Sequence, residues 1–280
     1  SSDVCSSDLE KEMGGTIDGD CVTWNGRTIE AIACPIGVDA QEFIAAGTSQ
    51  VAREMYGRVK ASLQSRSMIV GVDRLDYSKG LEERFNGYER FLRDNPDYHR
   101  NVVLVQVAPP SRGDVESYQE IRATLDSLAG RINGAYSDVD WTPIRYVNQG
   151  YPRDKLAGIY RAARIGLVTP LRDGMNLVAK EYVAAQDPED PGVLILSRFA
   201  GAALQLKDAL LINPYSPEEM ADAIKRGLNM PLEERKRRWH AMYECVTQED
   251  VHWWRNRFSA RLAGNSCTDE AEVSDTLAEV

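Results

Sequence analysis

Histidine and cysteine are scarce in this sequence. The three histidines, His99, His240 and His252, are too dispersed for a histidine-based metal centre. The five cysteines are odd in number and scattered, with neither CxxC nor Cys/His spacing, which argues against a disulfide framework and a zinc site. Because such unpaired cysteines suit a reducing compartment, we expect a cytoplasmic location. We expect no metal ion and no other cofactor.

Long apolar runs and an excess of positive charge are also lacking. A membrane-spanning helix needs about 18 or more consecutive apolar residues, and no such run occurs, so we expect no membrane partner. The net charge of −10 at pH 7 argues against a nucleic-acid partner but is compatible with a local basic pocket. With 280 residues, 43% of them hydrophobic, the chain can form a sizeable core in one or two domains.

The two ends of the chain lack the periodic apolar pattern of its middle. Residues 1–15 begin with a repeated Ser-Ser-Asp and lack the long apolar region of a signal peptide, so they are predicted to be a disordered or non-native leader. Residues 16–40 contain a hairpin signal at Asn25-Gly26. Residues 265–280 are acidic and polar and are predicted to be a flexible tail.

Strand-like and helix-like segments alternate through the rest of the chain. Apolar runs predict strands at residues 68–72, 102–107, 144–147, 165–168, 193–196 and 209–212. Helical periodicity and start signals predict helices at 41–63, 81–95, 115–132 and 153–163, from 175, after 216, from 231, and at 251–262. Strands separated by helices indicate right-handed βαβ units, so the predicted fold class is α/β with a doubly wound, Rossmann-like parallel sheet.

The most informative stretch is residues 168–183, VTPLRDGMNLVAKEYV. It reads as a strand end, a turn broken by Pro170 and Gly174, and a helix with periodicity from Met175. The helix N-terminus would lie at the carboxyl edge of the strands, where unpaired amides and the dipole attract anions. There Gly174 would let a ligand approach the backbone, and Asp173 could accept its hydrogen bonds. An ordinary βα unit whose carboxylates favour the helix dipole explains the pattern equally well.

The loop after the first of these strands, residues 72–80, carries two cations five positions apart. Arg74 and Lys79 could both point at one anion, with Gly80 opening the next helix. Two fixed cations at a helix N-terminus could stabilise a leaving diphosphate without a metal. The alternative is that both are surface cations paired with Asp73 and Asp76.

The loops after the next two strands carry further polar candidates. Arg112 lies on a proline-flanked turn that suits phosphate capture, and its alternative is a salt bridge to Asp114 or Glu116. The ring of Tyr151 could line the site beside the base of a nucleotide. The alternative is that Tyr151 only packs against its neighbours. Because the carboxyl ends of parallel strands meet at one edge, we expect all these loops to lie together.

Three segments carry a resemblance to a known family. Residues 72–80 (VDRLDYSKG), 111–114 (SRGD) and 173–181 (DGMNLVAKE) closely resemble the trehalose-6-phosphate synthases, which are retaining glucosyltransferases. The likeness continues in unbroken order from roughly residue 17 to residue 262. It implies the C-terminal lobe of a GT-B glycosyltransferase, with residues 41–264 as the nucleotide-sugar-binding lobe and residues 16–40 as a remnant of the N-terminal acceptor lobe.

This resemblance implies a reaction and its partners. The family transfers glucose from UDP-glucose to glucose 6-phosphate with retention, giving α,α-trehalose 6-phosphate and UDP, and no enzyme nucleophile is expected. A homo-oligomer of the full-length protein is compatible with the resemblance. Because the N-terminal lobe contributes much of the acceptor site, we expect the 280-residue chain alone to be weakly active or inactive.

The resemblance also assigns roles to individual positions. Arg74 and Lys79 match the residues that hold the diphosphate, and Asp173 matches the residue at the donor sugar, so these three form the expected catalytic set. Arg112 matches a contact to the acceptor phosphate, and Tyr151 falls at a uridine-contact position. The rest of the expected donor-binding segment is Gly174, Met175, Asn176, Leu177, Val178, Ala179, Lys180 and Glu181, with Glu181 contacting the ribose hydroxyls.

Other functions are compatible with the same residues. A related synthase could use glycerol 3-phosphate or another nucleotide donor, because Arg112 fits any phosphorylated acceptor. A noncatalytic nucleotide-sugar-binding or regulatory protein is the alternative from a different class, although intact Arg74, Lys79, Asp173 and Glu181 argue against it. A pyridoxal-phosphate-dependent phosphorylase shares the broad fold, but no lysine stands out as a Schiff-base candidate.

Overall fold

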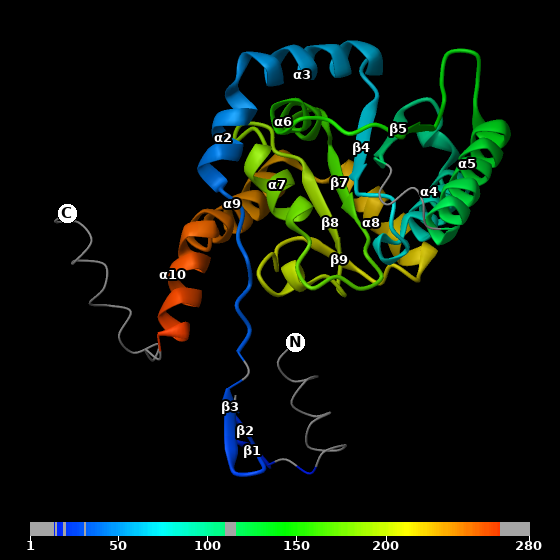
Figure 1. The fold of residues 1–280 in the computed structure, drawn as a ribbon. Coiled ribbons are helices and arrows are strands. Elements are labelled where there is room, and N and C mark those ends of the chain that lie inside the picture. The colour runs from blue at the N-terminus through cyan, green and yellow to red at the C-terminus, as the bar shows by residue number, and fades with distance from the viewer. Residues whose placement is uncertain (1–13, 15, 19–20, 31, 110–115, 264–280) are drawn as a thin grey trace. The chain divides into compact units, whose positions relative to one another are not determined.

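A computed structural model of the chain describes residues 14, 16–18, 21–30, 32–109 and 116–263 (Figure 1). Arg112, the predicted tail and all of the predicted leader except Gly14 lie outside the described residues. The chain divides into two compact units, one of residues 37–251 and one drawn from residues 1–36 and 252–280.

The smaller unit contains an antiparallel sheet of β1 (Thr16–Asp18), β2 (Cys21–Trp24) and β3 (Arg27–Glu30). A two-residue turn joins β2 to β3, and both its residues, Asn25 at φ 51° and Gly26 at φ 72°, have the left-handed conformation of a type I′ hairpin turn. The predicted hairpin is therefore confirmed. Helix α10 (Val251–Leu262), also confirmed, belongs to this unit from His252 onward.

The larger unit is built on a six-stranded parallel sheet. Its strands are β4 (Ser67–Val72), β5 (Val102–Val107), β6 (Ile144–Val147), β7 (Ile165–Val168), β8 (Val193–Ser197) and β9 (Leu210–Ile212). They lie in the order β6-β5-β4-β7-β8-β9, which is the order of a doubly wound Rossmann-type sheet (Figure 1). The fold prediction is confirmed, and each predicted strand agrees with the observed one to within one residue at either end.

Helices cover both faces of the sheet. The helices of this unit are α2 (Ala40–Thr48), α3 (Gln50–Leu63), α4 (Leu81–Asp94), α5 (Glu116–Tyr136), α6 (Arg153–Ala162), α7 (Leu177–Ala185), α8 (Pro217–Asn229) and α9 (Leu232–Gln248), with short 3-10 turns η1 (Tyr77–Lys79), η2 (Pro96–Tyr98) and η3 (Gly201–Leu204). Helix α4 packs against α5 and α8, whereas α6 packs against α2, α3 and α7. In the described ranges, no helix has the length and apolar character needed to cross a bilayer.

One helix prediction was wrong. The stretch from 41 to 63 was expected to be a single helix, but the structure divides it into α2 and α3 at Ser49. The backbone of Ser49 is extended, and its hydroxyl accepts a hydrogen bond from the amide of Ala52 at 3.1 Å. A serine at this position caps a new helix, because its side chain satisfies an amide that the helix itself leaves unpaired.

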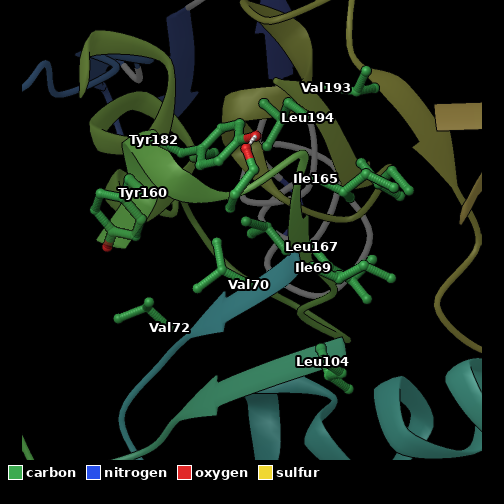
Figure 2. Close-up of a cluster of buried hydrophobic side chains, with 14 of the residues drawn as sticks. Ile69, Val70, Val72, Leu104, Tyr160, Ile165, Leu167, Tyr182, Val193 and Leu194 are labelled. Carbon is green, nitrogen blue, oxygen red and sulfur yellow. Dashed lines mark hydrogen bonds between the residues drawn. The ribbon is translucent and has the colours of Figure 1, made fainter. Parts of the chain in front are cut away.

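The core lies between the sheet and its two helical layers. Figure 2 shows part of it: apolar side chains of β4, β5, β7 and β8 extend from both faces of the sheet, and Tyr160 of α6 and Tyr182 of α7 lie on one of these faces. Every residue of β7 and β8 is buried. Burial on both faces explains why these strands appear in the sequence as continuous apolar runs rather than as alternating patterns.

The sheet reverses its winding between β4 and β7, and this switch point brings two loops together. Gly80, at φ +62°, ends the loop that follows β4. A Cβ built on Gly80 would lie only 2.1 Å from the carbonyl oxygen of Thr169, in the loop after β7. Glycine at position 80 therefore allows both the left-handed backbone and the close approach of the two loops.

We predict that Gly80→Ala lowers the free energy of unfolding by about 3 kcal/mol, because alanine adds a clash to an unfavourable backbone conformation. Urea denaturation measures this change. Gly130→Ala is the control, since Gly130 lies inside α5 and, apart from its own helix backbone, no atom of the described residues lies within 4 Å of the added methyl group; it should raise stability by about 0.5–1 kcal/mol. Equal stability of the two variants would contradict the proposed constraint at Gly80.

Candidate functional site

Two hydrogen bonds to backbone carbonyls join the loops after β4 and β7. The amide of Leu171 donates to the carbonyl of Ser78 at 2.8 Å, and the hydroxyl of Thr169 donates to the carbonyl of Gly80 at 3.1 Å. The two carbonyl groups that accept these bonds belong to the residues directly before and after Lys79. The backbone on both sides of the predicted diphosphate cation is therefore fixed to the neighbouring loop.

Lys79 and Asp173 form a direct ion pair across the switch point. The Lys79 ammonium lies 2.6 Å from Oδ2 of Asp173, and the two side chains are 17% and 16% exposed. The amide of Met175 donates to Oδ1 of Asp173 at 3.3 Å, and the side-chain amide of Asn176 donates to Oδ2 at 3.2 Å. Asp173 thus holds a partly exposed ammonium at the carboxyl edge of the sheet, and the structure brings two of the three predicted catalytic residues into contact.

The alternative pairing of the loop cations with Asp73 and Asp76 is not what the structure shows. Asp73 is buried and pairs with Arg84, and Asp76 caps η1 by accepting hydrogen bonds from the amide and hydroxyl of Ser78 at 2.9 and 2.8 Å. Partial burial acts to raise the pKa of Asp76, but these hydrogen bonds and the nearby positive charges of Lys79 and Arg74 bring it below its usual value. Asp76 is therefore ionised at neutral pH.

Arg74 is the exposed cation of the same loop. Its guanidinium makes no hydrogen bond or ion pair with any residue in the part of the chain that the structure describes. Because no other described side chain occupies its donors, Arg74 can offer a planar, bidentate contact to an anion.

The helix of the predicted donor segment begins two residues later than the sequence pattern indicated. Helix α7 starts at Leu177 rather than at Met175, because Asn176, at φ 73°, caps it and accepts a hydrogen bond from the amide of Ala179 at 3.3 Å. The positive end of the α7 dipole thus lies beside the loop that carries Asp173. Gly174 is exposed, and Leu177 and Val178 are half-buried.

Sequence reasoning did not assign a role to the loop after β8, which supports this site. The amide of Gly201 donates to the carbonyl of Asp173 at 2.9 Å, and the amide of Ala202 donates to the carbonyl of Met175 at 2.8 Å. A Cβ on Gly201 would lie 2.0 Å from the carbonyl oxygen of Gly174. The Phe-Ala-Gly-Ala-Ala sequence at 199–203 was a usable signal, because a glycine between small residues indicates close backbone approach.

Glu181 lies on α7 with a fixed partner. The hydroxyl of Tyr160 donates to its Oε2 at 3.3 Å. Burial raises the pKa of Glu181, and the Tyr160 hydrogen bond and the charge of Arg153 offset only part of this rise. A half-buried carboxylate with one oxygen held by a tyrosine can present its other oxygen to ligand hydroxyls.

Two other residues of the expected donor site lie against the core. Lys180 is 1% exposed, and burial lowers the pKa of its amine while Cys245 and Glu249, both in or next to α9, act to raise it. Tyr151 is half-buried and packs against the main core.

Among the described residues, no three His, Cys, Asp or Glu side chains are grouped so as to hold a metal ion.

Fold and site together define a Rossmann-type lobe that carries Arg74, Lys79 and Asp173 at its switch point. The model of glycosyltransferase family 20 matches residues 3–264, and the chain belongs to that family. The predicted family is therefore confirmed, and with it the GT-B type of Rossmann-like lobe.

Relatives and solved structures agree with this assignment. The chain is 46% identical over 262 residues to a trehalose-6-phosphate synthase of Sinorhizobium fredii, a match that covers 93% of this chain and 56% of the relative. It is 50% identical over 233 residues to one from an Enterobacter species, covering 83% and 49% of the two chains. The chain thus spans about half the length of the curated relatives it matches.

Among solved structures, the chain resembles a UDP-forming α,α-trehalose-phosphate synthase of Burkholderia xenovorans in complex with glucose 6-phosphate, with a TM-score of 0.89, 46% identity, and coverage of 92% of this chain and 57% of that one. It also resembles the Escherichia coli protein bound with UDP-2-fluoro glucose, with a TM-score of 0.85, 46% identity, and coverage of 88% and 55%.

We predict that Tyr160→Phe raises the pKa of Glu181 further, because the tyrosine hydrogen bond favours the charged carboxylate. Carbon-13 NMR of the glutamate carboxyl groups, followed through a pH titration, measures this pKa. Tyr215→Phe is the control, since Tyr215 is 59% exposed and pairs with Phe199 rather than with Glu181. A Glu181 titration that is the same in both variants would contradict the assigned hydrogen bond.

Proposed function

We propose that this chain is the nucleotide-sugar-binding lobe of a UDP-forming trehalose-6-phosphate synthase, which transfers glucose from UDP-glucose to glucose 6-phosphate. The observation that carries the proposal is the ion pair of Lys79 with Asp173 beside the exposed Arg74, at the switch point of the sheet. Nucleotide ligands bind at such switch points in open α/β sheets. The printed names of the relatives and the ligands of the two solved structures support the choice of substrates.

The two loop cations would act on the leaving diphosphate. When the bond from the glucose C1 to the phosphate oxygen breaks, negative charge grows on the diphosphate and positive charge grows on the sugar ring. Lys79 is already oriented by Asp173, so it stabilises that charge without reorganisation, and Arg74 adds a second cation. No metal ion is required for this stabilisation.

The sugar is transferred with retention, without an enzyme nucleophile. A new bond forms between C1 and the anomeric oxygen of glucose 6-phosphate on the face from which UDP departs. The proton of that anomeric hydroxyl passes to the leaving phosphate oxygen, so UDP leaves and α,α-trehalose 6-phosphate is formed. In this proposal Asp173 contacts the donor sugar, and Arg112, outside the described residues, keeps its predicted role at the acceptor phosphate.

The start of α7 would hold the nucleoside. Its positive dipole end attracts the diphosphate, and Glu181 accepts hydrogen bonds from the ribose hydroxyls. Because only the ionised carboxylate accepts with both oxygens, the protonation state of Glu181 matters for binding.

Calorimetric titration of UDP into the chain tests the proposal. We expect saturable binding that is unchanged by EDTA, weakened about thirtyfold by Lys79→Ala and about tenfold by Arg74→Ala, because each removes a charge-assisted contact. Arg53→Ala is the matched control, since Arg53 is an exposed arginine on α3, and it should bind as the wild type does. Absence of UDP binding by the folded wild-type chain, or equal effects of all three variants, would contradict the proposal.

The raised pKa of Glu181 predicts a pH dependence of donor affinity. At a pH above the pKa of Glu181 the carboxylate is charged and the affinity for the donor is highest. As the pH falls through this pKa, Glu181 takes up a proton and the affinity falls. The fall should therefore occur at a higher pH than an ordinary glutamate would produce. UDP-glucose is the ligand to use, because its phosphates do not titrate in this range. Glu181→Gln should remove the fall, and an unchanged pH profile in that variant would exclude Glu181 as its cause.

A further inference from the structure

A fully buried arginine lies beneath the two loops of the site. Arg84, in the first turn of α4, donates from Nη1 to Oδ2 of Asp73 at 2.6 Å and to Oε1 of Gln106 at 2.8 Å. Its Nε donates to the hydroxyl of Thr169 at 3.0 Å. Asp73 directly follows β4, Gln106 lies on β5 and Thr169 directly follows β7, so one side chain connects the carboxyl ends of three neighbouring strands.

Thr169 is the link between this network and the cation of the site. An arginine Nε–H can only donate, so the Thr169 oxygen accepts from it, and the hydroxyl hydrogen is left for another acceptor. That acceptor is the carbonyl of Gly80 at 3.1 Å, which also accepts from the backbone amide of Arg84 at 2.9 Å. Gly80 directly follows Lys79, so the orientation of the Thr169 hydroxyl fixes the backbone next to the ammonium-bearing residue.

Stability alone is a weak reason for such a network. Removing an arginine and an aspartate from water is costly, and buried ion pairs are often no more stabilising than apolar residues of the same volume. Asp73 is 4% exposed and Arg84, Gln106 and Thr169 are 0% exposed, so all four are almost completely removed from water. What the network supplies is a defined geometry, since each of its hydrogen bonds constrains the end of a strand or the loop that follows it.

We propose that Arg84 and Thr169 are positioning residues for Lys79, and that the Thr169 hydroxyl transmits the fixed position of Arg84 to the diphosphate-binding loop. The consequence for donor binding rests on the proposed function of Lys79 as a diphosphate ligand. The positions of Arg84, Thr169 and Lys79 do not depend on a bound donor, because the Arg84–Thr169 and Thr169–Gly80 hydrogen bonds and the Lys79–Asp173 ion pair are present without one.

Thr169→Val and Thr169→Ser form a matched pair for the test. Valine has the shape of threonine but can neither accept from Arg84 nor donate to Gly80, whereas serine keeps the hydroxyl and loses only a methyl group. The backbone bond from Leu171 to Ser78 is present in both variants, so valine should loosen the loop at Gly80 without dismantling it. We expect valine to weaken UDP binding about fivefold and serine to change it by less than about twofold.

A double-mutant cycle separates positioning from a general effect on stability. If Thr169 acts through Lys79, Thr169→Val should cause no further loss of UDP affinity in a Lys79→Ala background. The same fivefold loss in that background would overturn the proposal, because Thr169 would then act independently of Lys79. Unchanged affinity in the Thr169→Val single variant would overturn it as well.

Lysine labelling of the ligand-free chain tests the positional claim without UDP. Acetic anhydride labelling, quantified by mass spectrometry, should modify Lys79 at least about twofold faster in Thr169→Val than in the wild type or Thr169→Ser, since a loosened lysine spends less time paired with Asp173. The exposed Lys225 on α8 is the reference lysine. The wild type and the two variants are compared at a temperature at which Lys225 is labelled at the same rate in all three chains. Equal Lys79 labelling in the three chains would overturn the proposal. Failure of the wild type to bind UDP would instead contradict the proposed function, and the labelling would still decide the positional claim.

Discussion

The structure depends on the parallel pairing of β4 with β7, which sets Ile69 opposite Ile165 and Val70 opposite Gly166. This pairing is the point where the chain crosses from one half of the sheet to the other, so the loops that follow the two strands leave toward opposite layers of helices. Gly166 is part of the same constraint, because a Cβ there would lie 2.7 Å from the ring of Tyr182 on α7. The missing side chain lets α7 pack closely on β7, and the start of α7 is thereby held at the edge of the sheet.

The charge of the site is local and does not follow from the charge of the chain. The net charge is −10, yet Arg74, Lys79 and the start of α7 present positive charge at one edge. The carboxylate of Asp173 offsets one of these charges, but it also orients the ammonium of Lys79 and accepts hydrogen bonds from the loop that bears it. The buried Arg84 adds a further cation whose position is fixed by Asp73 rather than by solvent.

The sequence was sufficient for the sheet and for the loops that meet at its switch point, because long apolar runs and chain breaks are local signals. It was not sufficient for the contacts. Lys79 has Asp76 three residues away, and only the tertiary structure shows that its partner is Asp173, 94 residues further along. Arg84 follows two glutamates in a helical stretch and looks like an ordinary surface charge in the sequence, but α4 turns it into the core. The break between α2 and α3 was missed because Ser49 does not interrupt the helical periodicity of the apolar residues, although serine is one of the preferred residues at a helix start.

The central claim is that the switch-point loops form a diphosphate site in this chain. A crystal structure of the chain with UDP tests it most directly. We expect diphosphate oxygens within hydrogen-bonding distance of the Lys79 ammonium and the Arg74 guanidinium, with the ribose beside Glu181 and the Thr169–Gly80 hydrogen bond intact. A diphosphate bound elsewhere on the lobe, with Lys79 still paired only with Asp173, would contradict the account.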